Sequence, residues 1–237
     1  MTTLDLPRPD GTWETLDLHP AREWPSHGGF TSRVAFGAAH VITRALGDNT
    51  PGQPADVDWD STLAFREHLF AHGLGVAEAM DTAQRGMGLD WATTQELISR
   101  SAAQAKAHGA RIASGAGTDH LAADVDSVDD VLAGDETQLE FVESTGSQAI
   151  IMASRQLARA ATTSEDYFKV YDRLLTQADR PVILHWLGTA FDPALEGYWG
   201  SSDVTTATAN FLDLITAHSS KVDGVKVSLL DADHEKG

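Results

Sequence analysis

Short apolar runs recur along the chain from about residue 31 onward, and each is separated from the next by a stretch with helical spacing of its apolar positions. Six runs are present, with the length and the small or β-branched residues of buried strands. They are Val34–Ala39, Leu74–Met80, Arg111–Gly115, Gln148–Ala153, Pro181–His185 and Gly224–Ser228. Their first residues are 40, 37, 37, 33 and 43 positions apart, which is typical of repeated strand–loop–helix units.

Amphipathic helices are predicted between the runs, because apolar residues stand three and four positions apart there. Residues that favour the N-cap precede or open four of them, namely Asp58, Asp90, Ser164 and Asp203. The predicted helices are Trp59–His72, Thr93–His108, Val128–Thr145, Glu165–Gln177 and Val204–His218. Strands that alternate with helices imply a parallel sheet with helical crossovers.

The first thirty residues follow a different pattern. Two alternating segments, Thr3–Leu6 and Thr12–Leu18, flank a turn that contains Pro9, Asp10 and Gly11. Alternation on both sides of such a turn predicts a β-hairpin. We therefore expect an N-terminal β-hairpin appendage over residues 1–30 and an α/β domain over residues 31–237.

Two α/β architectures fit the repeated units, a closed TIM barrel of the (β/α)8 type and an open doubly wound sheet. The open sheet usually carries a glycine-rich turn after its first strand, whereas His40-Val41-Ile42-Thr43-Arg44 follows the first run here. We therefore predict the barrel. Such a barrel has eight units and this sequence provides about six, so we expect units seven and eight to be missing from it.

Composition excludes several classes of partner. The formal net charge of −18 is dispersed along the 237 residues, and such a surface repels nucleic acid and anionic membranes. No apolar run has the length of a membrane span, and the polar N-terminus does not resemble a signal peptide. The chain contains no cysteine, which excludes disulfides and thiolate metal sites. We expect a cytoplasmic protein.

A single lysine lies inside the sixth run, and the surrounding segment from Val222 to Leu230 is typical of a buried strand. Burial of an unpaired ammonium is costly and is usually relieved by a lower pKa, which yields the neutral amine that forms a Schiff base with a carbonyl compound. Of the five lysines, only Lys226 has apolar neighbours on both sides. The alternative is a lysine at a sheet edge, or one paired with a carboxylate, that has no chemical role.

Ionisable residues gather after the runs, where β/α barrels carry their chemistry. The loop from Asp81 to Leu89 has hydroxyl, amide and guanidinium groups that suit a substrate carboxylate. For each single residue, helix capping or local hydrogen bonding is the alternative. The candidates at the run ends are His40, Glu78, Asp81, Thr82, Ser114, Thr118, Asp119, His120, Ser154, Arg155, His185, Trp186, Lys226, Ser228 and Asp231.

The fifth and sixth runs, Pro181-Val-Ile-Leu-His185 and Gly224-Val-Lys226-Val-Ser228, resemble the corresponding strands of the dihydrodipicolinate synthase and N-acetylneuraminate lyase superfamily. The segments Ala79–Trp91 and Ile183–Gly188 are similar to an uncharacterised bacterial branch of it. The resemblance runs from about residue 31 to the end. It implies a class I aldolase barrel in which Lys226 forms an imine and Thr82 binds the substrate carboxylate.

The resemblance is incomplete at three places. His185 stands where the superfamily has a proton-relaying tyrosine, and the Ser154–Arg155 region replaces a second tyrosine. The arginine that reads a second carboxylate in dihydrodipicolinate synthases has no counterpart within Trp186–Ala190. Imine chemistry is therefore better supported than lysine biosynthesis.

We expect a lyase or aldolase that acts on pyruvate or a related 2-oxo acid, without a cofactor, as a homodimer or homotetramer. Lys226 and His185 are the expected catalytic residues. The expected substrate-binding residues are Asp81, Thr82, Arg85, Ser114, Asp119, Arg155 and Ser228.

Two alternatives remain open. One is a metal-dependent isomerase or class II aldolase with ligands among His40, Glu78, Asp119, His120 and His185. The other is a barrel without catalytic activity that binds a small molecule, since a fold does not determine a function.

Overall fold

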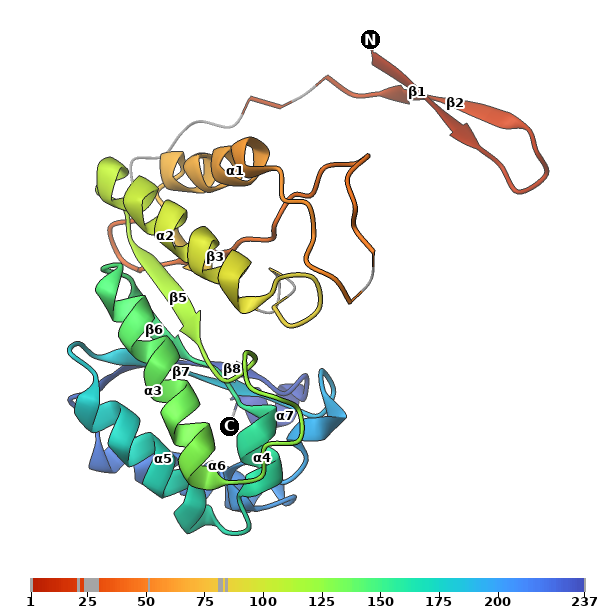
Figure 1. Ribbon diagram of the computed structural model, residues 1–237. Coiled ribbons are helices and arrows are strands. Elements are labelled where there is room, and N and C mark those ends of the chain that lie inside the picture. The colour runs from red at the N-terminus through yellow and green to blue at the C-terminus, as the bar shows by residue number, and fades with distance from the viewer. Residues whose placement is uncertain are drawn as a thin grey trace.

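The computed structural model describes residues 2–20, 22–23, 30–50, 52–80, 83 and 85–236. Its main feature is a six-stranded parallel sheet in the order β3-β4-β5-β6-β7-β8 (Figure 1). The strands are β3 (Phe36–Ala38), β4 (Gly75–Glu78), β5 (Ile112–Ala116), β6 (Gln148–Ile151), β7 (Val182–Leu187) and β8 (Val222–Ser228). Each coincides with one predicted run, so the α/β class and the parallel strands are confirmed. The sheet is curled but open, with β3 and β8 at its two ends, and a closed barrel is not seen among the described residues.

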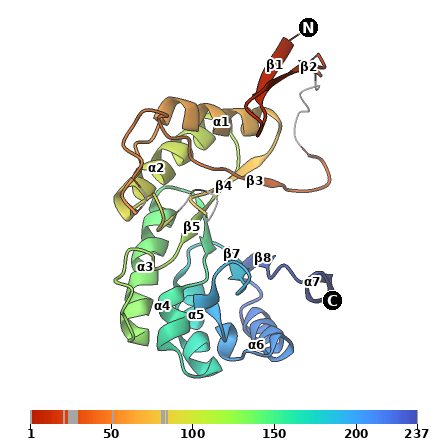
Figure 2. The same ribbon diagram turned by 90° about the vertical axis from the view of Figure 1, so that its right-hand side faces the viewer.

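The five predicted helices are also present, on the outer side of the curled sheet (Figures 1 and 2). They are α1 (Trp59–Ala71), α2 (Trp91–His108), α3 (Val128–Ser144), α5 (Ser164–Gln177) and α6 (Val204–Ala217). Asp58, Asp90 and Asp203 cap three of them through their side chains, as predicted. None of the described helices is both long and apolar enough to cross a membrane.

The predicted N-cap Ser164 is wrong by one residue. Thr163 is the N-cap of α5 and forms a capping box with Asp166. The Asp166 carboxylate accepts hydrogen bonds from the backbone N–H groups of Thr162 and Thr163, which fixes the first turn one position earlier.

Four short elements escaped the sequence analysis because they contain too few residues to show a period. They are α4 (Arg155–Ala160), α7 (Ala232–Lys236) and the 3-10 helices η2 (Pro193–Leu195) and η3 (Tyr198–Gly200). Helix α4 follows β6 directly and begins at its N-cap Ser154. Its position at the carboxyl end of the sheet makes it part of the candidate site.

The two faces of the sheet bury different side chains. The helix-facing side packs Ala149, Leu184 and Trp186 into a large core with the helices. The inner side carries a small apolar cluster that includes Ala77, Ala113, Ile150 and the partly buried Ile183. Because successive strand residues point to opposite faces, His185 shares the inner face with Ile183.

Strand β8 is not buried on both faces, contrary to our expectation. Gly224, Lys226 and Ser228 on its inner face are half-buried, whereas Val225 and Val227 are 48% and 37% exposed. The outer side of β8 is therefore only partly covered at Val225 and Val227. The apolar run predicted the strand correctly, but an apolar side chain does not guarantee that a neighbour covers it.

The N-terminal hairpin is present as predicted, with β1 (Thr2–Pro7) antiparallel to β2 (Trp13–Leu18). Figure 1 shows it standing apart from the rest of the chain, and every residue in both strands is exposed. One face carries Leu4 opposite Leu16, with Leu6 and Leu18 beside them.

Candidate active site

Lys226 and His185 lie side by side on the inner face of the sheet. They are register partners on the neighbouring parallel strands β8 and β7, so their side chains leave the sheet in the same direction. The Lys226 Nζ atom is 3.0 Å from the His185 Nε2 atom. His185 is 1% exposed, whereas Lys226 is half-buried and remains accessible from the inner side.

His185 is held in its neutral form. Burial lowers its pKa from 6.5 to about 3, and the positive charge of Lys226 acts in the same direction. A neutral imidazole has a lone pair on one ring nitrogen, so His185 can accept a hydrogen bond at neutral pH.

Arg85 organises the loop after β4. Its guanidinium donates to both carboxylate oxygens of Asp119, at 2.5 and 3.2 Å, and to the carbonyl oxygen of Gly115 at 2.7 Å. It also donates to the side-chain oxygen of Gln138 and, at 3.3 Å, to the carbonyl oxygen of Ala79. Since these acceptors occupy all five N–H donors, Arg85 ties two loops together and has no donor left for a substrate carboxylate.

Asp119 is correspondingly kept ionised. Burial alone would raise its pKa, but the charge and hydrogen bonds of Arg85, together with the Gln138 amide, outweigh burial and hold the pKa below its usual value. Gln138 on α3 also donates to Asp119 at 3.0 Å and lies 2.7 Å from the Nδ1 atom of His120. Arg85, Asp119, Gln138 and His120 thus form one connected polar network.

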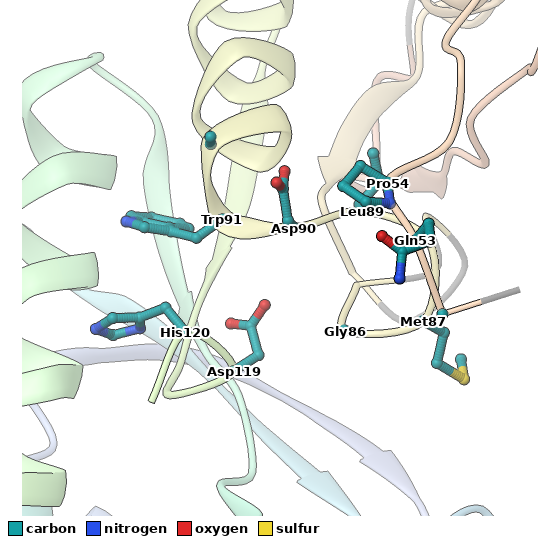
Figure 3. A pocket seen from close by; sticks show the side chains of 12 residues that line it. Gln53, Pro54, Gly86, Met87, Leu89, Asp90, Trp91, Asp119 and His120 are labelled. Carbon is teal, nitrogen blue, oxygen red and sulfur yellow. The ribbon is translucent and has the colours of Figure 1, made fainter. Parts of the chain in front are cut away.

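One cavity of about 580 Å³ opens beside this network, between the loops after β4 and β5 and the segment at Gln53 (Figure 3). The figure shows Asp90 and Asp119 on opposite sides of it, with Gln53 facing them. The rings of Trp91 and His120 lie in a tilted contact with their centroids 5.7 Å apart. Burial lowers the pKa of His120, so its ring is neutral and suits this contact.

A second cavity of about 570 Å³ lies at the carboxyl ends of β5, β6 and β7. Leu187 on β7 and Met152 after β6 belong to its wall, and Leu187 is two residues beyond His185 on the same face. Further wall residues come from α4 and from the loop after β7. They include Arg155, Gln156, Arg159, Asp192, Ala194 and Leu195.

The predicted substrate-binding residues do not all lie beside Lys226 and His185. Ser114 is fully buried on the helix-facing side of β5, beside its register partner Glu78, and thus points away from Lys226. Arg155 is on α4 at the rim of the second cavity and forms an ion pair with Asp192. Ser228 is two residues beyond Lys226 on the same face of β8. Asp81 and Thr82 lie outside the described residues.

The residues of the metal alternative are dispersed. Glu78 binds the guanidinium of Arg66 on α1 through two hydrogen bonds of 2.8 Å, on the helix-facing side. Asp119 is paired with Arg85, and His40 stacks on Phe65. In the part of the chain that the structure describes, no group of three or more His, Asp or Glu side chains could hold a metal ion.

Three polar residues in or beside the site are not among the candidates from the sequence. Gln138 and the neighbouring Asp135 lie on the buried stripe of α3, and Arg159 lies one turn after Arg155 on α4. The sequence contained a signal for Gln138 and Asp135, because both occupy positions on the apolar stripe of α3. A polar residue at such a position is expected to be buried, and a buried polar group needs a partner.

Comparisons with known proteins agree with this fold. The family model described as "Protein of unknown function (DUF993)" matches residues 4–237. A search of the curated proteins found no match. Two solved structures resemble this chain: YagE, a prophage protein of the dihydrodipicolinic acid synthase family from E. coli K12 in complex with pyruvate, and dihydrodipicolinate synthase from Bacteroides thetaiotaomicron.

The likeness to these structures concerns the fold. YagE is 13% identical with a TM-score of 0.51 over 84% of this chain, and the Bacteroides enzyme is 16% identical with a TM-score of 0.46 over 79%. The chain spans 64% and 62% of their respective lengths, slightly under two thirds. The curled parallel sheet thus has a fold similar to that of YagE.

Proposed function

The chain belongs to the family described as protein of unknown function (DUF993), and we propose that it is an imine-forming lyase or aldolase that acts on pyruvate or a related 2-oxo acid. The observation that carries the proposal is the 3.0 Å contact between Lys226 Nζ and the buried, neutral His185. The YagE fold supports it, because the crystal structure of that protein contains pyruvate.

Lys226 is the proposed nucleophile. The Lys226 ammonium first loses a proton to solvent, and the neutral amine then attacks the ketone carbon of the 2-oxo acid to form a C–N bond. The ketone oxygen leaves as water with the two amine protons, and the imine nitrogen takes one proton back from solvent. The resulting protonated imine accepts an electron pair when a bond at the adjacent carbon breaks. Pyruvate loses a proton from that carbon, and a longer substrate loses a carbon fragment.

His185 is the proposed proton acceptor. The Lys226 nitrogen, which carries the positive charge of the imine, lies next to His185. Burial lowers the pKa of His185, and the charge on Lys226 lowers it further. When the proton leaves carbon, the imine becomes a neutral enamine and the contribution of this charge disappears. The pKa of His185 therefore rises as the proton arrives, which favours the transfer.

Borohydride trapping tests the proposal. The protein is incubated with pyruvate and borohydride, and the modified residue is located by mass spectrometry. We expect a reduced adduct on Lys226 in the wild type and none in Lys226→Arg, which keeps the charge and most of the length of the side chain but cannot form the imine.

Lys106→Ala is the matched control, because Lys106 is exposed on α2 far along the chain from the site. This variant should label like the wild type. Labelling confined to surface lysines, or equal labelling of Lys226→Arg, would contradict the proposal and favour a barrel that binds small molecules without catalysis.

A further inference from the structure

The second cavity is larger than pyruvate needs. Its volume of about 570 Å³ is within the range of sites for whole metabolites, whereas pyruvate has only three carbon atoms. Lys226 and His185 are not part of the cavity wall, but Leu187, two residues beyond His185 on the same face of β7, is, and the cavity extends from there to α4. The chain of a substrate whose carbonyl group reaches Lys226 would enter this cavity past Leu187.

The wall of this cavity has an apolar middle and a cationic far end. Met152, Ala153, Leu187, Ala194 and Leu195 provide the apolar surface. Arg155 and Arg159 stand one helical turn apart at the α4 end. Methylene groups suit the first part and an anionic group suits the second.

The two arginines differ in how they are occupied. Arg155 pairs with Asp192, whereas Arg159 donates one long hydrogen bond of 3.4 Å to the Ala123 carbonyl oxygen and has no ion pair among the described residues. The third arginine of the wall, Arg85, is fully committed to protein acceptors. Arg159 is consequently the side chain with the most donors available to a ligand.

The floor between Met152 and α4 is rigid. The Thr118 hydroxyl is 2.6 Å from the Ser154 hydroxyl and donates to the Gln156 side chain at 2.8 Å. Ser154 caps α4 through the Leu157 N–H group. The position of α4, and with it the spacing between the arginines and β7, is thus fixed by buried hydrogen bonds.

We propose that this cavity selects 2-oxo acids with an extended chain and a second, terminal acid group, which Arg159 and Arg155 bind. This inference rests on the proposed function for the position of the carbonyl group. The charge balance of the wall supports it, because three arginines face two aspartates in a protein whose net charge is −18. A terminal anion at the α4 end of the cavity would pair with Arg159, just as Asp192 pairs with Arg155.

Two probes of equal length test the proposal, 2-oxoadipate with a terminal carboxylate and 2-oxohexanoate with a terminal methyl group. The half-saturating concentration of each is measured by borohydride trapping on Lys226 and, independently, by calorimetry without borohydride. We expect 2-oxoadipate to bind at least about tenfold more tightly. In Arg159→Gln this preference should fall to near parity.

Arg100→Gln is the matched control, since Arg100 is an exposed arginine on α2 and should retain the preference. The inference is overturned if the two probes bind with equal affinity, or if Arg159→Gln and Arg155→Gln both leave the preference intact. Labelling of Lys226 would still support the proposed function in either case. A preference that depends on the arginines without any labelling of Lys226 supports the subsite and overturns the imine mechanism.

Discussion

Lys226 and His185 occupy paired positions on β8 and β7, and their nitrogen atoms are 3.0 Å apart. The pairing is set by the backbone ladder, so neither side chain needs a flexible loop to reach the other. Because a one-residue shift of register would move one of them to the other face, the contact depends on the alignment of the two strands.

The first prediction concerns the stability of the protein in mild acid. Burial and Lys226 lower the pKa of His185 from 6.5 to about 3, so the unfolded chain binds a proton there that the folded protein rejects. The stability that this histidine provides is complete above pH 6.5 and decreases as the pH falls toward 3, with a slope of up to about 1.4 kcal/mol per pH unit.

Urea unfolding at pH 7 and pH 5 measures this effect. Other groups such as Asp135 also change the stability over this range, so the comparison is between variants. The change in unfolding free energy from pH 7 to pH 5 should favour the folded state more in His185→Gln than in the wild type. In His234→Gln, which removes an exposed histidine on α7, the change should equal that of the wild type. Identical pH dependence in all three proteins would show that His185 is not held neutral.

The second prediction concerns the buried ion pair of Arg66 and Glu78, whose side chains are fully inaccessible. Arg66→Met leaves a carboxylate in the core without its main partner, and we expect a loss of about 3–5 kcal/mol in unfolding free energy. The double variant Arg66→Met, Glu78→Leu should lose less than the single one, because it buries no charge.

Guanidinium unfolding of the two variants checks this prediction. The exposed pair of Arg173 and Glu136 provides the comparison, and Arg173→Met should cost less than about 1 kcal/mol. A double variant that is as unstable as Arg66→Met would mean that packing, and not the unpaired charge, causes the loss.

The third prediction concerns Asp135 on α3. Burial raises its pKa from 3.8 to about 8, and its Oδ1 atom has no hydrogen-bond partner among the described residues. The folded protein therefore keeps a proton that the unfolded chain releases above pH 3.8, and stability falls as the pH rises from about 4 to 8.

Asp135→Asn replaces the protonated acid by a neutral group of the same shape. We expect it to raise the unfolding free energy at pH 8 by more than about 1 kcal/mol and to have little effect near pH 4. Thermal unfolding at the two pH values is the measurement. An equal loss of stability at both pH values would contradict the prediction, because it would show that Asp135 is ionised and paired in the folded protein.

The fourth prediction concerns the hairpin, which we propose as an appendage over residues 1–30. Every residue of β1 and β2 is exposed, so its deletion removes no side chain from the core. Removal of residues 2–18 should leave the urea midpoint of the α/β domain unchanged. A clear decrease in the midpoint would show that the leucine face packs on the domain in solution.

The sequence predicted the elements of the fold because apolar spacing is a local property. The six runs and five helical segments could be located by their periods, and Gly224-Val-Lys226-Val-Ser228 pointed to Lys226, the nucleophile that we propose. Paired turn residues likewise predicted the hairpin of β1 and β2. Short elements such as α4 remained hidden because six residues do not display a period.

Tertiary structure decided which candidates share a site. In the sequence, Ser114 and His185 occupy the same kind of position near the end of an apolar run. In the structure, Ser114 faces the helices and His185 faces Lys226. The difference arises because the direction of a side chain depends on the register of its strand. Arg85 looked like a donor for substrate, but Asp119, Gln138 and two carbonyl groups use all its hydrogen bonds. These partners are distant in sequence, so only the folded chain brings them together and determines which charges remain available.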